Sequence, residues 1–556
     1  MPQAIAGSDA LDVLQIRNLD IRLAGLRHAD PVLSGIDLTI RRGETLCLVG
    51  ESGSGKSVSS LAVMGLLPDA LYVNAGSIRL QGEELIGKSP GAMRKLRASR
   101  AAMIFQEPMT ALNPVLRVGD QIAEVLALHS THDKAAIRSR VRDIADQVQL
   151  PDPERILRAY PHELSGGQRQ RVMIAMALVL EPALLIADEP TTALDVTTQR
   201  QILSLIAKLK ERHGTAVLFV THDMGVVSEI ADTVAVMHQG RVVESAPVDR
   251  LLRHPQEEYT RSLLSAVPSL VPRPARSFAQ AAPVLRVRAL EKFYGGGGLF
   301  RKRGAVCAAT EVSFDLLKGQ TIGIVGESGS GKSTVARCVM RLIDPSAGQL
   351  LLGDNDITRL GRAALGPYRR KFQVVFQDPN RSLNPRWTVG RSLIEGPVNF
   401  GTPLKQAEVG ARRLLDIVGL PADSMERYPH QFSGGQRQRI AIARAVAMRP
   451  DVLVADEAVS ALDVSVQAQV LDLLATLQAD LGLGILFITH DLRVAAQICD
   501  RVIVMQKGSI VEQGSAGELL ADPKHPYTRE LIEAAPGRNW DFRNFRPLDA
   551  TARAIP

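Results

Sequence analysis

Two copies of one octapeptide decide the fold: Gly50-Glu51-Ser52-Gly53-Ser54-Gly55-Lys56-Ser57 and Gly326-Glu327-Ser328-Gly329-Ser330-Gly331-Lys332-Ser333. Both copies fit the pattern G-x-x-x-x-G-K-[ST] of a phosphate-binding loop. Each follows a short apolar run and precedes a segment with helical periodicity, which is the strand–loop–helix context that the motif needs. Glycines let backbone N–H groups approach a phosphate, and the positive end of the next helix attracts it. The sequence therefore predicts two phosphate sites.

Side chains of the two loops have distinct expected roles. Lys56 and Lys332 would reach the β- and γ-phosphates of a nucleotide, and Ser57 and Ser333 would hold Mg²⁺. The next residue differs between the copies: it is Val58 in the first and Thr334 in the second. We include both among the expected phosphate-binding residues.

Composition is that of an ordinary soluble protein, with 45% hydrophobic and 22% charged residues among 556. The net charge of +7 is a mild basic bias for this length and does not indicate nucleic-acid binding. The four cysteines form no CxxC pair or Cys/His cluster, so we expect neither a zinc site nor an iron–sulfur cluster. The longest apolar stretch is broken by Glu181 and Pro182 and is too short to span a membrane.

The whole pattern repeats with a period of about 270 residues, which predicts two homologous domains. We expect a first domain at 1–268, a Pro/Ala-rich linker at 269–283, a second domain at 284–536 and a disordered tail at 537–556. Apolar strands alternate with helices, so each domain should be α/β with a parallel sheet, and ligands should bind at the carboxyl ends of the strands. Even the domain ends repeat: HPQEEYTRSLLSAVP at 254–268 matches HPYTRELIEAAP at 525–536.

Polar residues follow further strands in both halves. An acidic pair ends one apolar strand of each half, Asp188-Glu189 and Asp456-Glu457. The aspartate could bind Mg²⁺, and the glutamate could polarise a water for attack on the γ-phosphate. A surface acid after a strand would be the alternative, but both pairs follow a phosphate loop at a similar distance.

Single polar residues end two more strands. His222 and His490 stand in the shared string Thr-His-Asp, and we expect them to sense the γ-phosphate. A lone histidine is usually structural, so the repeat carries this interpretation. Gln106 and Gln377 could contact Mg²⁺ or the attacking water, although a glutamine alone is a weak signal.

A third repeated feature has no use inside its own phosphate site, namely Ser165-Gly166-Gly167-Gln168 and Ser433-Gly434-Gly435-Gln436. A hydroxyl, bare backbone amides and a helix N-terminus suit a second anion site.

This set of motifs, in this order, resembles the ATP-binding cassette (ABC) ATPases, and the resemblance covers nearly everything except the leader, linker and tail. It implies two tandem cassettes of the P-loop NTPase class, each with a mostly parallel sheet core and a helical subdomain, and with ATP and Mg²⁺ as cofactors. It also implies D-loops at Ala193-Leu194-Asp195 and Ala461-Leu462-Asp463. The implied catalytic residues are Glu189, Glu457, His222, His490, Gln106 and Gln377, and the implied metal-binding residues are Ser57, Gln106, Asp188, Ser333, Gln377 and Asp456.

The resemblance also gives the serine–glycine stretches a use. In this family two cassettes pair head to tail, so that each ATP lies between one phosphate loop and the other cassette's signature. Lys56 would share its ATP with Ser433 and Gly435, and Lys332 with Ser165 and Gly167. Both cassettes lie in one chain, so the pair can form within the molecule at high effective concentration.

Four less specific stretches are similar to those of the di- and oligopeptide, nickel and glutathione importers: FQEPMTALNP, FQDPNRSLNP, YPHELSGGQ and YPHQFSGGQ. This similarity implies an ATPase that powers uptake, of peptides above all, at the cytoplasmic face of the plasma membrane. The implied partners are two integral membrane permease subunits and an extracytoplasmic substrate-binding protein, with no nucleic acid. Import of glutathione, nickel or another small solute, and a soluble ribosome-associated twin-cassette ATPase, are the alternatives.

The chain also departs from the family pattern. Tyr294 is the expected aromatic that stacks on adenine, but Arg22 or Leu23 occupies the corresponding place in the first cassette. Phe432 replaces the leucine seen as Leu164, and Ala458 replaces the proline seen as Pro190. Both cassettes keep the lysine, the acidic pair, the histidine and the signature, so we expect two hydrolysing sites.

Overall fold

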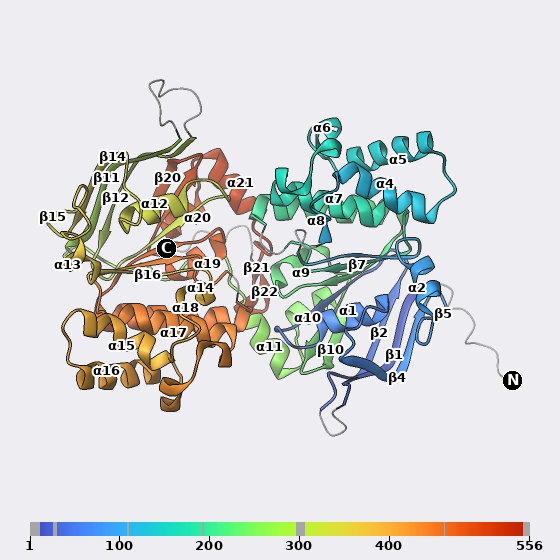
Figure 1. Ribbon diagram of the computed structural model, residues 1–556, viewed down its shortest axis with the longest axis horizontal. Helices are drawn as coiled ribbons and strands as arrows, with labels where there is room; N and C mark the ends of the chain where they lie inside the picture. The colour runs from blue at the N-terminus through green and yellow to red at the C-terminus, as the bar shows by residue number, and fades with distance from the viewer. Residues whose placement is uncertain are drawn as a thin grey trace. The chain divides into compact units, whose positions relative to one another are not determined.

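The computed structural model describes residues 12–25, 30–107, 111–191, 194–295, 306–460 and 462–548 (Figure 1). The chain divides into two compact units, residues 1–265 with 544–546 and residues 266–543 with 547–556. Each unit contains one antiparallel sheet, one mostly parallel sheet and a group of helices. The expected α/β architecture, repeated in two units, is confirmed.

The N-terminal unit has two sheets that share one hydrophobic core. The antiparallel sheet has the order β2-β1-β4-β5, and the second sheet has the order β10-β9-β3-β8-β7-β6, parallel except for the β9–β10 pair. The strands are β1 (Asp12–Leu23), β2 (Leu33–Arg41), β3 (Thr45–Val49), β4 (Leu71–Leu80), β5 (Glu83–Glu84), β6 (Ala101–Ile104), β7 (Leu184–Asp188), β8 (Ala216–Val220), β9 (Thr233–His238) and β10 (Arg241–Pro247).

Helices cover these sheets and build a separate helical part. Figure 1 shows α4 to α7 on one side of the parallel sheet and the antiparallel sheet on the other. The helices are α1 (Lys56–Met64), α2 (Pro90–Leu96), α4 (Val118–His129), α5 (Lys134–Gln147), α6 (Pro153–Arg158), η2 (Pro161–Glu163), α7 (Gly166–Leu178), α8 (Val196–His213), α9 (Met224–Ile230), α10 (Val248–Arg253) and α11 (Glu258–Ser265).

The C-terminal unit repeats this plan, with sheet orders β12-β11-β14-β15 and β16-β17-β18-β13-β19-β20. Its strands are β11 (Pro283–Tyr294), β12 (Val306–Leu317), β13 (Thr321–Val325), β14 (Ala347–Leu352), β15 (Asn355–Asp356), β16 (Phe372–Val375), β17 (Val452–Asp456), β18 (Gly484–Ile488), β19 (Arg501–Gln506) and β20 (Ser509–Ser515). Near the end of the chain, β21 (Trp540–Asp541) and β22 (Arg546–Pro547) form a further two-stranded sheet.

Its helices follow the same sequence of roles. They are α12 (Lys332–Val339), α13 (Gly366–Arg369), α14 (Pro379–Ser382), α15 (Val389–Asn399), α16 (Leu404–Ile417), η3 (Ala422–Glu426), η4 (Pro429–Gln431), α17 (Gly434–Val446), α18 (Val464–Leu481), α19 (Leu492–Ile498), α20 (Ala516–Ala521), α21 (Pro526–Ala534) and η5 (Phe542–Asn544).

The strand before each phosphate loop is central and fully buried. All five residues of β3 and of β13 are buried, because each strand lies between two parallel neighbours and is covered on both faces. Parallel neighbours end at the same edge of a sheet, so the polar residues that follow β3, β7 and β8 converge there. The phosphate loop follows β3, the acidic pair ends β7, and His222 follows β8.

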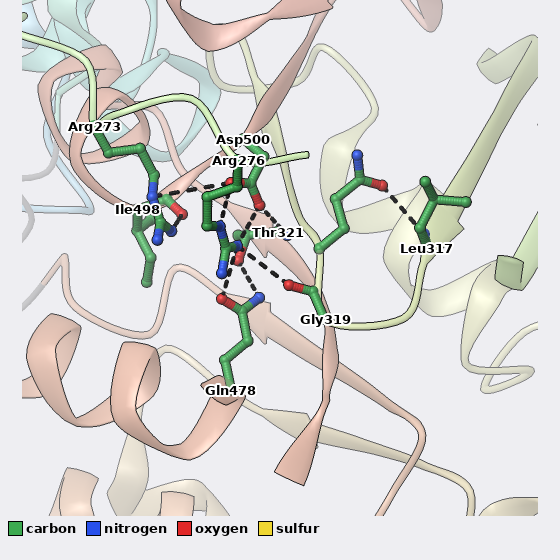
Figure 2. A network of polar contacts seen from close by, with 9 residues as sticks. Arg273, Arg276, Leu317, Gly319, Thr321, Gln478, Ile498 and Asp500 are labelled. Carbon is green, nitrogen blue, oxygen red and sulfur yellow. Dashed lines mark hydrogen bonds and ion pairs between the residues drawn. The ribbon is translucent and has the colours of Figure 1, made fainter. Parts of the chain in front are cut away.

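The segment expected to be a linker is hydrogen-bonded to the C-terminal unit. Residues 266–282 contain no helix or strand, but the backbone N–H of Arg273 donates to Ala496 O at 2.9 Å. Arg276 donates to both carboxylate oxygens of Asp500, at 2.8 and 2.5 Å, and its guanidinium also reaches Gly319 O and Gln478 Oε1 (Figure 2). Composition alone could not show that these arginines find acceptors more than 200 residues away.

The expected disorder of the tail is wrong over residues 537–548. Two short strands and one 3₁₀ turn lie there, and Phe542 is 1% exposed. Trp540 stacks on Phe542 with ring centres 6.3 Å apart, as a small aromatic cluster would. Two-residue strands leave no periodic pattern in the sequence, which explains the difference. Residues 549–556 lie outside the described part of the chain.

Over the described residues, the helices include none that combines the length and the apolar character needed to cross a lipid bilayer.

Candidate nucleotide sites

Close backbone contacts fix the shape of each phosphate loop. Gly50 has φ 148° and Gly326 has φ 150°, and a Cβ atom there would lie 2.2 Å from Met237 O and 2.3 Å from Met505 O, respectively. A side chain at either position would therefore collide with a neighbouring strand's backbone. The glycine pattern of the sequence reports this approach of the loop to β9 or β19.

The loop lysines are buried and turned back onto their own loops. Lys56 is 6% exposed, and its Nζ donates to Gly50 O and Glu51 O, both at 2.8 Å. Lys332 is 5% exposed and donates to Gly326 O at 2.8 Å and Glu327 O at 2.7 Å. These contacts hold each ammonium group against two carbonyl oxygens of its own phosphate loop, where it could meet a phosphate.

The structure brings together the residues expected to hold Mg²⁺, although they are far apart in sequence. Ser57 Oγ lies 3.2 Å from Asp188 Oδ1, and Ser333 Oγ lies 3.3 Å from Asp456 Oδ1. A hydroxyl and a carboxylate fit a hard cation that takes its other ligands from water and substrate phosphates. Within the described ranges no group of three or more His, Cys, Asp and Glu side chains is placed to hold a metal by itself.

Burial raises the pKa of Asp188, which is 7% exposed; the adjacent Glu189 also raises it, while Ser57 and Lys56 oppose the shift. Burial likewise raises the pKa of Asp456, together with Glu457. A cation at either site would relieve the cost of the buried negative charge. Both aspartates therefore have the electrostatic environment of a metal ligand.

Glu189 lies at the meeting point of three chain segments in the first site. His222 Nδ1 is 3.1 Å from Glu189 Oε1, and Gln106 Nε2 donates to Glu189 Oε2 at 2.9 Å. Glu189 has φ 46°, a left-handed backbone that is unusual for a residue with a side chain. Its N–H donates to Val220 O at 2.9 Å, which compensates for the strained conformation. The three residues predicted to act on the γ-phosphate are thus adjacent.

The second site has the same parts in a looser arrangement. His490 Nδ1 is 3.7 Å from Glu457 Oε1, and Gln377 Nε2 donates to Ser460 Oγ at 3.3 Å. The contact with His490 lowers the pKa of Glu457, and burial opposes this shift. Glu457 is therefore an ionised carboxylate at neutral pH, as a proton acceptor must be.

The signature stretches cap helices, and their serines are exposed. Ser165 is the N-cap of α7, where its Oγ accepts from Gln168 N and its N–H donates to Gln168 Oε1. Ser433 and Gln436 form the same capping box on α17. A Cβ on Gly167 or Gly435 would meet Thr198 at 2.7 Å or Val466 at 2.2 Å, so these glycines allow close packing on the next helix. Leu164 and its counterpart Phe432 are both 5% exposed, so the larger residue is accommodated in a core.

The expected adenine-stacking position, Val58 and the expected D-loops remain to be placed in the structure. Tyr294 ends β11 and is 40% exposed, with Lys292 Nζ 5.3 Å from its ring centre. Leu23 ends β1 in the same way, so the first cassette has no aromatic residue at that position. Val58 packs its side chain against the hydrophobic core. Residues 193 and 461 of the expected D-loops lie outside the described residues.

One contact to each phosphate loop was not predicted from the sequence. Tyr259 Oη accepts from Glu51 N at 3.3 Å, and Tyr527 Oη accepts from Glu327 N at 3.0 Å. The repeated HP…YT strings at the domain ends were the available signal.

Two known families each match this chain twice. A family described as "ABC transporter" matches residues 33–192 and 309–460. A second, described as "Oligopeptide/dipeptide transporter, C-terminal region", matches residues 243–306 and 511–549. The matches therefore include both phosphate loops, both signatures and both repeated domain ends.

Individual relatives are similar to almost the whole chain. Proteins named "Glutathione import ATP-binding protein GsiA" from Escherichia coli O6:H1 (strain CFT073) and strain K12 are 47% identical over 561 residues, covering 95% of this chain and 90% of each relative. The protein of that name from Salmonella choleraesuis is 46% identical over 563 residues. Among solved structures, cbiO1 from Clostridium perfringens aligns with 45% of this chain and 94% of its own at 28% identity, with a TM-score of 0.39.

Proposed function

The chain belongs to the ABC transporter family, and we propose that it is the ATP-hydrolysing subunit that powers uptake of a peptide through separate membrane permease subunits. One observation carries the proposal: each unit gathers a phosphate-loop serine, a buried aspartate, a glutamate and a histidine at one sheet edge. A loop that binds phosphate next to a carboxylate that can accept a proton is what phosphoryl transfer to water requires.

The chain's own residues would act as follows. ATP would draw Lys56 away from Gly50 O and Glu51 O, since its phosphate oxygens are stronger acceptors than carbonyls. Ser57 and Asp188 would hold Mg²⁺, which supplies charge neutralisation on the β- and γ-phosphates. Glu189 would accept the proton of the attacking water, positioned by His222 and Gln106. Lys332, Ser333, Asp456 and Glu457 would do the same in the second site.

We further infer that the signature of each cassette completes the other cassette's site. Ser165 and Ser433 are exposed at helix N-termini, where the hydroxyl of each serine accepts from the backbone N–H of its capping-box glutamine. Such a surface suits the far side of a nucleotide whose phosphates are already held by a loop. ATP would then draw the two cassettes together, and hydrolysis would release them.

Exposed apolar residues that are close in sequence to the catalytic glutamines support a partner contact in each unit. Phe105 and Leu116 are each 40% exposed, Val115 is 75% exposed, and Phe376 next to Gln377 is 37% exposed. Apolar side chains left in water in this way are typical of protein contacts. We assign these exposed residues of each unit to contacts with the permease subunits, which would place the chain at the cytoplasmic face of the membrane, with an extracytoplasmic protein delivering the substrate.

The substrate class rests on the relatives. The relatives that are 47% identical are named for import of glutathione, itself a tripeptide, and the matched C-terminal region is named for oligopeptide and dipeptide transporters. Peptides, with glutathione among them, are therefore the proposed cargo. Against a ribosome-associated role, residues 266–282 between the cassettes form no helix, whereas those factors carry a long charged helical insert.

Replacing both glutamates tests the enzymatic part. Glu189→Gln/Glu457→Gln should lower ATP turnover by at least about 100-fold, because a general base is removed, while ATP binding persists. Glu211→Gln/Glu408→Gln, at two exposed positions, is the matched control and should keep wild-type turnover. Wild-type turnover in the first double variant would refute the assignment.

The same variant tests the partners. Trapped with ATP and extracted in mild detergent, Glu189→Gln/Glu457→Gln should co-purify with two multi-span membrane proteins identified by mass. Recovery of ribosomal proteins without membrane subunits would overturn the transport role and leave the hydrolysis assignment intact.

A further inference from the structure

A tyrosine from each domain end is hydrogen-bonded to the phosphate loop of its own unit. Tyr259, on α11, accepts from Glu51 N at 3.3 Å, and Tyr527, on α21, accepts from Glu327 N at 3.0 Å. About 200 residues separate the partners in each case. The contact occurs independently in both units, so it is a repeated part of the design of this chain.

The bonded N–H belongs to a peptide group that the phosphate-loop lysine also contacts. The Gly50–Glu51 peptide presents its N–H to Tyr259, while its carbonyl, Gly50 O, accepts from Lys56 Nζ at 2.8 Å. The Gly326–Glu327 peptide is held by Tyr527 and by Lys332 in the same way, the lysine bond again measuring 2.8 Å. Two hydrogen bonds on opposite edges of the peptide fix the orientation of its plane. They thereby fix the position of the lysine ammonium group before a nucleotide binds.

Each tyrosine is itself anchored. Glu512 on β20 accepts from Lys524 N and His525 N, at 2.7 and 3.0 Å, and thereby fixes the turn that precedes α21. His525 Nδ1 then accepts from Tyr527 N at 3.2 Å, and Tyr527 is only 4% exposed.

The N-terminal unit repeats this anchoring. Glu244 on β10 accepts from Gln256 N at 2.9 Å and Glu257 N at 3.1 Å. The ring of His238 packs on Tyr259 with centres 4.0 Å apart. A rigid support is what a positioning residue needs, because a mobile phenol would not hold the loop.

We propose that Tyr259 and Tyr527 are positioning residues for ATP binding: each phenol orients the first peptide of the phosphate loop and thereby presets the lysine. The region that matches the oligopeptide/dipeptide transporter C-terminal family thus has a role inside the nucleotide site. This inference rests on ATP being the ligand of the loop, as proposed above. The inference goes beyond the proposed function because it gives a role to the repeated HP…YT strings.

The test is the double variant Tyr259→Phe/Tyr527→Phe, which removes two hydroxyls and keeps both rings. The matched control is Tyr368→Phe, the same chemical change at a tyrosine of α13 that packs against the hydrophobic core of the C-terminal unit. Each full-length protein is assayed for ATP affinity with a fluorescent ATP analogue, for KM and kcat, and for amide hydrogen exchange without nucleotide.

We expect ATP affinity to fall about three- to tenfold, the usual effect of losing one hydrogen bond, with KM rising and kcat nearly unchanged. Exchange should increase in the peptides containing residues 45–57 and 321–333 and stay unchanged elsewhere; in the control no quantity should move. Unchanged affinity and unchanged loop exchange would overturn the proposal, and so would exchange that increases throughout a unit, which would indicate a general packing role. None of these outcomes affects the hydrolysis assignment, which depends on the glutamate variant.

Discussion

Arg276→Ala gives a quantitative test of the linker's attachment. Asp500 precedes β19, its side chain is 6% exposed, and its Oδ2 accepts from Thr321 N, the first residue of the strand before the phosphate loop. Arg276 binds both oxygens of this carboxylate. The N-terminal unit has the same aspartate, Asp232, which accepts from Thr45 N. There the cation is Lys210, at 3.0 Å.

The two units differ in where this cation comes from. Lys210 and Gln478 each lie three residues before the end of their 18-residue helices, α8 and α18. Glutamine has no charge to offer Asp500, and Arg276 of the linker supplies it instead (Figure 2). The linker therefore completes the C-terminal unit with a charge that its own helix lacks.

Removing Arg276 should cost about 2 kcal/mol of stability in the C-terminal unit. A hydrogen bond to a charged group contributes about 1.5–3 kcal/mol, and breaking a fully buried pair costs about 3–5 kcal/mol. Arg276 is 32% exposed, and Asp500 keeps Thr321 N and has Arg273 Nε at 3.9 Å, so the lower range applies. In calorimetry one unfolding transition should shift down by roughly 4–8 °C. Lys210→Ala should shift the other transition by less, because Asp232 is 53% exposed.

Gln478→Lys makes the test specific. In the wild-type chain the new lysine would face Arg276 and destabilise the unit, whereas in Arg276→Ala it would neutralise Asp500 and restore stability. The effect of one substitution should thus change sign with the background, with a coupling above about 1 kcal/mol. If Gln478→Lys has the same effect in both backgrounds, within about 0.5 kcal/mol, Arg276 does not replace the missing lysine.

Two further predictions follow from burial. Burial raises the pKa of Asp188, so the stability that this side chain contributes is present only at low pH and is lost as the pH rises through that pKa. Asp188→Asn should therefore raise the unfolding temperature at pH 7 without Mg²⁺, lose this gain as the pH falls, and hydrolyse no ATP. A lower unfolding temperature of Asp188→Asn at pH 7 would contradict the reasoning. Burial raises the pKa of the Cys47 and Cys499 thiols and brings that of Cys338 to about 11, while Cys307 is exposed. Alkylation of the native protein at pH 8 should therefore modify Cys307 first. Mass analysis that finds Cys47 modified at an equal rate would refute this order.

Local signals explain why the fold could be predicted closely. The apolar runs at Thr45–Val49 and Thr321–Val325 are strands with these bounds, because a strand buried on both faces must be apolar throughout. The acids, histidines and glutamines were identified because each follows such a strand in two copies. The internal repeat showed which of these residues recur at matching positions, and a single copy of each motif would not have shown this.

The kind of chemistry could be predicted from the amino-acid sequence alone: glycines where a loop touches another backbone, a lysine and a serine at a helix start, and acids at strand ends. These depend on residues adjacent in the chain. The distant residues that support this chemistry became visible only in the folded chain: Tyr259 and Tyr527 on the loop peptides, and Arg276 on Asp500. A hydrogen bond between residues about 200 positions apart leaves no periodic trace in either segment, because its partners are brought together by the packing of whole elements.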